Sequence, residues 1–176
     1  MEGSFEKKLI SAATAGNLAS LRDLIDQGAY IDWQDGQGDT ALITAARERH
    51  IEVCRELLRY GADTAKTNRW GSTAIHVASG YGHRQIVQLL ASSGSDVNWM
   101  DIAGNTPSHC AAYWERIGVL EDLYNNGADW CIQNTEGKDV LQSAEAEKKF
   151  MSVQLINSIL RAARSRTSKQ QLKIGH

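Results

Sequence analysis

The chain has 176 residues and a mass of 19.4 kDa, which is the size of one domain with a hydrophobic core or of one short repeat array. Its net charge of −2 predicts no general affinity for polyanions, and no apolar segment is long enough to span a bilayer. The three cysteines, an odd number without a close pair, argue against a disulfide framework and a thiolate metal site and favour a reducing compartment. Because the first residues lack the sustained apolar run of a signal peptide, we expect an intracellular, cytoplasmic protein, with a nuclear location left open.

Glycines recur along the chain with a period of 33 residues, which indicates a repeat architecture. One series comprises Gly28, Gly61, Gly94 and Gly127. A second series, offset by ten residues, comprises Gly38, Gly71, Gly104 and Gly137. In three units a threonine follows the second glycine by two positions, and a pair of small residues, mostly alanine, follows it by seven and eight. So many matches at one spacing predict stacked copies of one unit.

Each unit is predicted to form two short helices joined by a turn. The second glycine and its polar neighbours form a tight turn, because glycine adopts positive φ without a steric penalty. A threonine such as Thr73 then caps the first helix, whose alanines allow a neighbouring helix to approach closely. The second helix has apolar residues at helical spacing and ends at a glycine such as Gly94 in the left-handed conformation. Neither helix is long enough to be stable alone, so burial against adjacent units must hold the stack together.

These units resemble ankyrin repeats. The stretches "GDTALITAA", "GSTAIHVAS" and "GNTPSHCAA" are similar to the turn and first helix of that family, and "ELLRYGAD", "LLASSGSDVN" and "LYNNGAD" to its second helix and the start of its finger loop. The resemblance implies an all-α solenoid of stacked helix-turn-helix units with β-turn fingers. It divides residues 5–160 into an N-terminal capping repeat at 5–34, full repeats at 35–67, 68–100 and 101–133, and a C-terminal capping repeat at 134–160.

The fourth unit departs most from the family pattern. Ser108 and Tyr124 occupy positions where a core leucine is expected, and Asp139 replaces the capping threonine of the next unit. We expect the fourth unit to pack less ideally, or Tyr124 and Trp114 to fill the space differently. Trp130 is compatible with either partner binding or local packing.

Four histidines fall in two series with the same period, His76 with His109 and His50 with His83. Metal ligands must converge to about 2.0–2.1 Å from one ion, whereas periodic residues of a stack form a ladder, so we predict structural roles for all four. The resemblance implies that His76 and His109 hydrogen-bond between neighbouring turns. Ser79 lacks the surroundings of a nucleophile elbow and replaces the second alanine of its unit. We therefore expect a non-enzymatic protein without catalytic, metal or cofactor sites.

The resemblance also implies where a partner binds, since ankyrin arrays present a concave surface built from finger tips and the exposed face of the first helices. In the third and fourth units the variable positions of this surface carry an unusual number of large apolar residues. Core packing does not readily account for them, because the core positions are already occupied by periodic Ala, Leu, Ile and Val. Exposed aromatic residues and arginines dominate binding hot spots, although packing between neighbouring fingers is the alternative interpretation. The predicted partner-binding residues are Arg47, Arg69, Trp70, Tyr81, Met100, Ile102, Tyr113 and Trp114.

The tail, residues 161–176, is basic and contains no acidic residue. Its composition favours disorder. A contact with an acidic protein surface or a nucleic acid is one interpretation, and a solvated tail that folds against the acidic body is the other. The possible contact residues are Arg161, Arg164, Arg166, Lys169 and Lys173.

The leading functional hypothesis is an adaptor or scaffold that binds a partner protein through the concave surface of its third and fourth units. One alternative is a constitutive subunit of a large cytoskeletal or ribonucleoprotein assembly, docked through the basic tail. Another is a regulatory or inhibitory subunit of an enzyme. Separately, Asn98 resembles the finger asparagine that asparaginyl hydroxylases modify in ankyrin proteins, with Leu90 at the favourable upstream position. The sequence does not identify the partner, because one scaffold serves unrelated targets in this family.

Overall fold

A computed structural model describes the backbone of residues 4–174 and the side chains of residues 5–162. The described chain is all-α: it forms ten helices and no strand. In chain order the helices are α1 (Ser4–Ala15), α2 (Leu18–Asp26), α3 (Ala41–Arg47), α4 (Ile51–Arg59), α5 (Ala74–Tyr81), α6 (Arg84–Ser92), α7 (Pro107–Tyr113), α8 (Ile117–Asn125), α9 (Val140–Ala146) and α10 (Phe150–Ile174). No helix within residues 4–174 is both long and apolar enough to cross a membrane.

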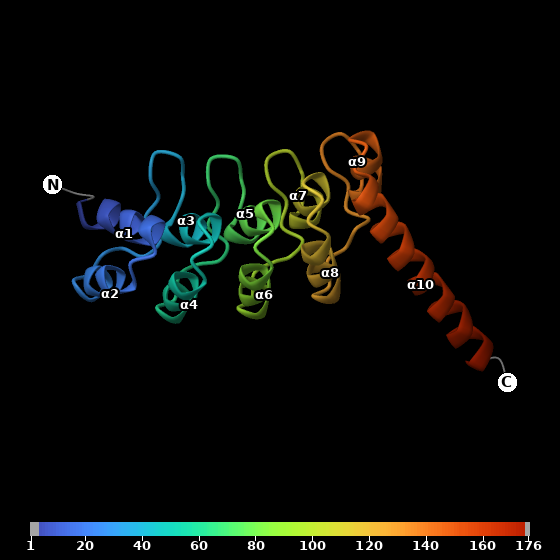
Figure 1. The fold of residues 1–176 in the computed structure, drawn as a ribbon, viewed down its shortest axis with the longest axis horizontal. Coiled ribbons are helices and arrows are strands. Elements are labelled where there is room, and N and C mark those ends of the chain that lie inside the picture. Colours follow the sequence, from blue (N-terminus) through green and yellow to red (C-terminus); the bar gives the residue numbers. More distant parts are fainter. Residues whose placement is uncertain (1–3, 175–176) are drawn as a thin grey trace.

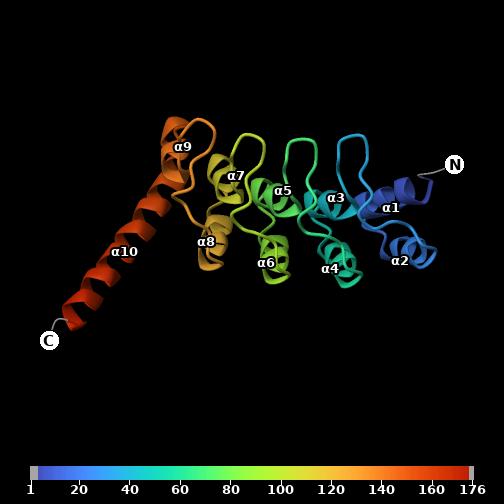
Figure 2. The same cartoon turned by 180° about the vertical axis from the view of Figure 1, so that it is seen from behind.

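The helices stack in two rows, as the repeat pattern predicts. In Figure 1, α1, α3, α5 and α7 form one row and α2, α4, α6 and α8 form the other, with finger loops rising above the first row. Figure 2 shows the same two rows from behind, with α9 and α10 at the C-terminal end of the stack. Helix α10 crosses residue 160 without a break and leaves the stack obliquely.

The core consists of apolar ladders that run along the stack. Equivalent positions of the five second helices hold Leu24, Leu57, Leu90, Leu123 and Ile156, and all five side chains are buried. Each repeat contributes one rung and buries it against its neighbours, so the stack has one continuous core although no repeat has a core of its own.

The predicted caps form at the N-terminal ends of the first helices. Thr40 Oγ1 accepts a hydrogen bond from the backbone N–H of Ile43 at 3.2 Å. Asp139, the substitute for threonine, accepts from the backbone N–H of Gln142 at 2.8 Å, while Gln142 Oε1 accepts from the backbone N–H of Asp139 at 3.0 Å. This reciprocal pair is a capping box, so the aspartate preserves the function of the threonine that it replaces.

Trp130 fills the space that Ser108 leaves in the fourth repeat. Its indole Nε1–H donates to Ser108 Oγ at 3.2 Å, and its ring packs against Tyr124 with ring centres 5.0 Å apart. Trp130 is therefore a packing residue and is only 5% exposed. Tyr124 takes part in this rearrangement as expected, whereas Trp114 does not and keeps 57% of its side chain exposed.

A left-handed residue joins the two helices of every repeat. Gly16, Gly82 and three non-glycine residues, Arg49, Glu115 and Lys148, occupy this position with φ between 52° and 84°. At Gly82 a Cβ atom would lie 2.8 Å from Arg116 Cδ, so the positive φ and the close approach of Arg116 both favour glycine there. The three larger residues occupy the same conformation with the strain that glycine avoids.

Candidate protein-binding surface

Hydrogen bonds between neighbouring fingers position the predicted surface. The backbone N–H of Arg69 donates to the carbonyl of Gln37 at 2.9 Å, and the N–H of Ile102 donates to the carbonyl of Trp70 at 3.0 Å. Within the second of these fingers, Asn68 Oδ1 accepts from the backbone N–H groups of Trp70 and Ser72, both at 3.1 Å. The finger tips are therefore held in register with one another, and their side chains are presented from a rigid base.

Buried histidines anchor the base of two fingers. His76 Nδ1 accepts from the backbone N–H of Thr73 at 3.3 Å, so its Nε2 carries the hydrogen that is donated to the carbonyl of Asn105, 3.1 Å away in the next repeat. His109 repeats this pattern with the carbonyl of Lys138 at 3.2 Å. The expectation that these histidines bond between neighbouring turns is confirmed. Burial lowers the pKa of both imidazoles, so both are neutral at physiological pH.

A second ladder of side chains links the helix–helix turns. The Nε2 atoms of His50 and His83 lie 2.9 Å from the carbonyl oxygens of Thr14 and Arg47, each in the preceding repeat. In the fourth repeat Arg116 takes the same place, and its Nε–H donates to the carbonyl of Gly80 at 3.0 Å. These contacts bear out the structural roles predicted for the two histidines.

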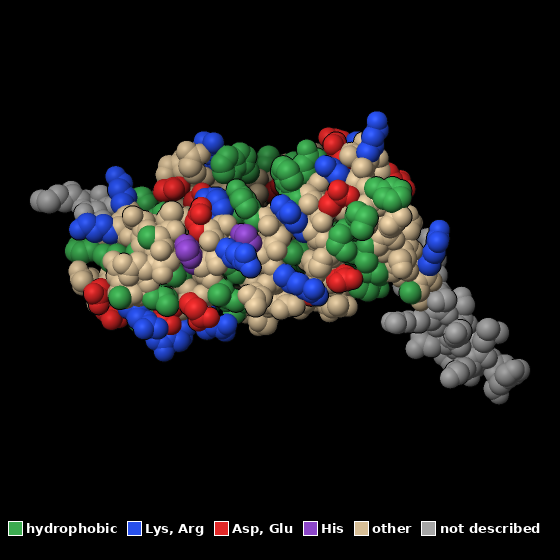
Figure 3. Space-filling model, viewed as in Figure 1, with side chains coloured by type: hydrophobic (Ala, Val, Ile, Leu, Met, Phe, Trp, Pro, Cys, Tyr) green, Lys and Arg blue, Asp and Glu red, His purple; other side chains and the backbone are tan. Residues whose placement is uncertain are grey.

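The six large apolar residues of the predicted surface are all exposed. Their exposed fractions are 49% for Trp70, 56% for Tyr81, 53% for Met100, 73% for Ile102, 44% for Tyr113 and 57% for Trp114. In Figure 3, hydrophobic atoms cover the tips of the fingers that precede α5 and α7, whereas the finger preceding α3 is largely polar. Core packing therefore does not account for these residues.

The structure divides the predicted set into a finger group and a helix-end group. The finger group comprises Arg69, Trp70, Met100 and Ile102, and the helix-end group comprises Tyr81, Tyr113 and Trp114. In the finger group, the Arg69 guanidinium lies over the Trp70 ring at 4.3 Å, and the backbone of Ile102 bonds to Trp70. In the helix-end group, Tyr113 and Trp114 meet edge to face with ring centres 5.1 Å apart. Tyr81 lines the same pocket as Trp114.

Arg47 stands apart from both groups. Its guanidinium donates to Asp39 Oδ2 at 2.7 Å, and the Asp39 side chain is almost fully buried. Arg47 is thus engaged in an intramolecular ion pair, and its side chain is about half as exposed as the aromatic residues of the two groups.

Two pockets hollow the surface beside the helix-end group. One, of about 380 Å³, lies between α5 and α7 and includes Val77, Gly80 and Tyr81 in its lining. The other, of about 320 Å³, lies between α7 and α9. Cys110 and Trp114 line both pockets, so the Trp114 indole separates two adjoining depressions. Burial raises the pKa of the Cys110 thiol to about 12, so the thiol that lines the two pockets stays protonated.

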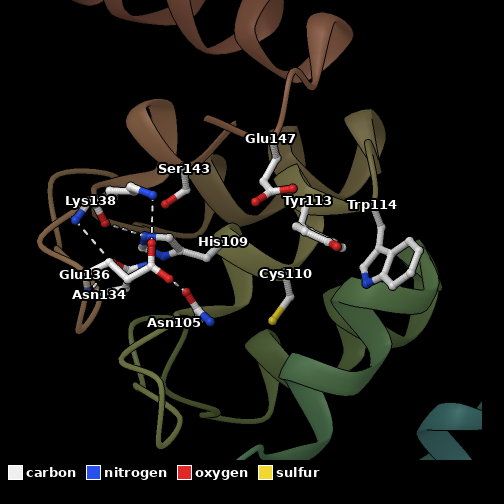
Figure 4. A pocket seen from close by; sticks show the side chains of 10 residues that line it. All are labelled: Asn105, His109, Cys110, Tyr113, Trp114, Asn134, Glu136, Lys138, Ser143 and Glu147. Atoms are coloured by element: carbon white, nitrogen blue, oxygen red, sulfur yellow. Dashed lines mark hydrogen bonds and ion pairs between the residues drawn. The ribbon is translucent and has the colours of Figure 1, made fainter. Parts of the chain in front are cut away.

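The pocket between α7 and α9 is polar on its finger side. In Figure 4, Asn134, Glu136 and Lys138 project from the finger before α9, opposite Tyr113 and Trp114. Lys138 Nζ lies 2.7 Å from Glu136 Oε2, and this ion pair lowers the pKa of the carboxyl and raises that of the ammonium. The two charges are thus largely balanced within the pocket wall.

The amide of Asn98 is used within the stack. Its Oδ1 accepts from the backbone N–H of Asp129 at 2.8 Å, and its Nδ2 donates to the carbonyl of Gly127 at 3.3 Å. Hydroxylation of Asn98 stays a prediction from the sequence. A modifying enzyme that grips this amide must first separate it from the neighbouring repeat.

The tail contacts also stay predictions. Arg161 is exposed on α10. Arg164, Arg166, Lys169 and Lys173 lie outside the residues whose side chains the structure describes. Helix α10 carries this basic segment away from the two rows of helices (Figure 2).

Sequence reasoning identified the exposed aromatic residues but missed the pockets beside them. It also missed the contact of Arg116 with Gly80 and the position of Lys149 Nζ, 4.6 Å from the centre of the Tyr113 ring. A signal for the first pocket was present, since Gly80 stands where the neighbouring repeats have Arg47 and Tyr113. A missing side chain at a surface position indicates a depression, but its depth depends on the neighbouring helix.

Comparison with known proteins agrees with the architecture. A family model for ankyrin repeats, described as three copies, matches residues 9–101 and 61–134. A search of curated proteins found no match. Ankyrin repeats in general mediate protein–protein interactions. The matched stretches together span more than half of the chain and coincide with the stacked helix pairs, so this protein belongs to the ankyrin repeat family.

Proposed function

We propose that this chain is a non-enzymatic adaptor that binds a segment of a partner protein through the concave surface of its third and fourth repeats. The observation that supports the proposal best is the exposure of six large apolar side chains on neighbouring fingers and helix ends, three of which line two pockets. Monomeric proteins rarely leave such residues clustered in water without a partner.

The composition of the surface also favours a protein partner. Trp, Tyr and Arg carry most of the binding energy in protein interfaces, and Trp70, Tyr81, Tyr113, Trp114 and Arg69 bring these residue types together. Binding would bury side chains that the stack leaves at least 44% exposed. Their removal should therefore weaken association far more than it weakens the fold.

The test compares three forms of the full chain as bait in quantitative affinity purification: wild type, the double variant Trp70→Ala/Trp114→Ala and the control Tyr30→Ala. Tyr30 is 57% exposed, as is Trp114, but it lies outside the proposed surface. We expect proteins retained by wild type and by Tyr30→Ala to be lost from the double variant, whose thermal unfolding midpoint should change by no more than a few degrees. A collapsed midpoint would show that the two tryptophans stabilise the fold, and equal retention by all three baits would refute the surface.

A further inference from the structure

We infer that the pocket between α5 and α7 receives one large apolar side chain of the partner and that Arg116 binds a carboxylate next to it. The partner segment then carries an acidic residue beside a large apolar one. This inference rests on the proposed function and specifies the chemistry of the segment that is bound.

The first observation that supports the inference is the absence of a side chain at Gly80. It lies in the last turn of α5 with ordinary helical φ, where glycine is less favourable than alanine. A Cβ atom at this position would meet Trp114 Cδ1 at 3.5 Å and Cys110 Cβ at 3.9 Å, which are ordinary van der Waals distances. Neither the backbone nor the packing requires glycine here, in contrast to Gly82. What the missing side chain provides is the open floor of the pocket.

The walls of the pocket suit an apolar side chain. Tyr81 and Trp114 flank Gly80, while Val77 and Cys110 line the pocket further along α5 and α7. The volume of about 380 Å³ is near the lower end of the range for ligand sites, so the pocket fits one large side chain and not an extended ligand.

Arg116 supplies a fixed cation at the same pocket. Its Nε–H is committed to the carbonyl of Gly80, which orients the guanidinium. The remaining N–H groups of the guanidinium have no hydrogen-bond or ion-pair partner in the part of the chain that the structure describes, whereas Arg47 and Arg84 are paired with Asp39 and Asp122. A guanidinium with free donors in a fixed plane matches a carboxylate.

The acidic residue next to Arg116 in the sequence does not neutralise it. Glu115 Oε1 accepts from the backbone N–H of Met151 at 2.9 Å, which directs this carboxylate toward α10. On the other side of Trp114, the charges of Glu136 and Lys138 balance each other. The unpaired charge beside the apolar pocket is therefore positive, and an acidic neighbour of the inserted side chain is complementary to it.

The experiment titrates the isotope-labelled full chain with three probes that share a phenyl ring: 3-phenylpropionate, its neutral amide, and 3-phenylpropylamine, which is a cation at neutral pH. Binding is followed by NMR at the amides of Gly80 and Tyr81 and at the indole N–H of Trp114. We expect millimolar dissociation constants for the acid and the amide, as is typical of fragments of this size, with the acid about threefold tighter than the amide. The cation should bind more weakly than either.

Three variants assign the effect to the residues named. Gly80→Ala should weaken binding of the acid and the amide several-fold without lowering the thermal unfolding midpoint, because the added methyl group occupies the pocket floor while favouring the helix. Arg116→Gln should abolish the preference for the acid and leave binding of the amide unchanged. Arg55→Gln is the control, since it makes the same charge change at an exposed arginine of α4 that is paired with Glu52, and it should keep the preference.

Three outcomes would overturn the inference: equal affinity for all probes, shifts centred on the pocket between α7 and α9, or no shift at about 10 mM probe. They are distinguishable from failure of the proposed function. If Gly80→Ala weakens probe binding and Arg116→Gln loses the preference for the acid, but both variants retain the partners of wild type, the inference fails and the adaptor stands. If the probes bind as expected but Trp70→Ala/Trp114→Ala retains every partner, the adaptor surface fails, and with it the inference that the pocket serves the partner.

Discussion

Replacement of Ser79 by alanine should stabilise the protein, although Ser79 is fully buried at 0% exposure. Its Oγ has no hydrogen-bond partner within the described residues. A buried hydroxyl without a partner costs about 1–3 kcal/mol of desolvation, and alanine also has the higher helix propensity. The equivalent residues of the adjoining repeats, Ala46 and Ala112, are alanines with at most 1% exposure, so the site already accommodates a methyl group. After subtraction of the small loss of van der Waals contact, we expect the free energy of unfolding to rise by about 1–2 kcal/mol.

Urea denaturation followed by circular dichroism measures this change as a higher midpoint at an unchanged slope. The matched control is Ser108→Ala, the same substitution at a side chain that is also 0% exposed. Ser108 Oγ accepts from the Trp130 indole, so its removal leaves a buried N–H without a partner and should lower the free energy of unfolding by about 1–2 kcal/mol. The two variants must shift the midpoint in opposite directions. A loss of stability in Ser79→Ala would refute the reasoning, because it would mean that the hydroxyl has a partner in solution.

Two further predictions concern the backbone and the buried histidines. Arg49→Gly should raise the free energy of unfolding by about 0.5–1 kcal/mol, because Arg49 has a φ of 66° that glycine adopts without strain. Thermal denaturation measures this change. The reverse substitution at the equivalent turn, Gly82→Ala, should lower the free energy of unfolding. Burial lowers the pKa of His76 below its ordinary value of 6.5, so in acid the unfolded chain binds more protons than the folded chain. The contribution of neutral His76 to the free energy of unfolding is therefore complete above pH 6.5 and is lost as the pH falls through the folded-state pKa. His76→Gln should flatten this decline in urea melts between about pH 7.5 and 5.5, because glutamine keeps the capping box, as Gln142 does in α9, but does not titrate. An unchanged pH dependence would assign the decline to other groups.

The sequence by itself determined the architecture of this protein. The 33-residue period places one glycine in each finger and one after each second helix, together with one cap at each first helix and one apolar rung at each second helix. These are requirements that a residue type satisfies. It also predicted which aromatic residues stay out of the core, because the core positions were already filled. Trp70, Tyr81 and Trp114 are exposed for that reason.

The tertiary structure decided which side chains of different helices and fingers meet. Trp130 packs over the small Ser108 and donates to its hydroxyl, and Arg47 is paired with the buried carboxylate of Asp39. Trp114 lies beside Gly80 of the preceding repeat, and a pocket remains there next to Arg116. A period identifies equivalent positions but not the rotamers and separations of the side chains that occupy them. Those depend on how neighbouring repeats pack, and in this chain the irregular residues of the fourth repeat give the surface its shape.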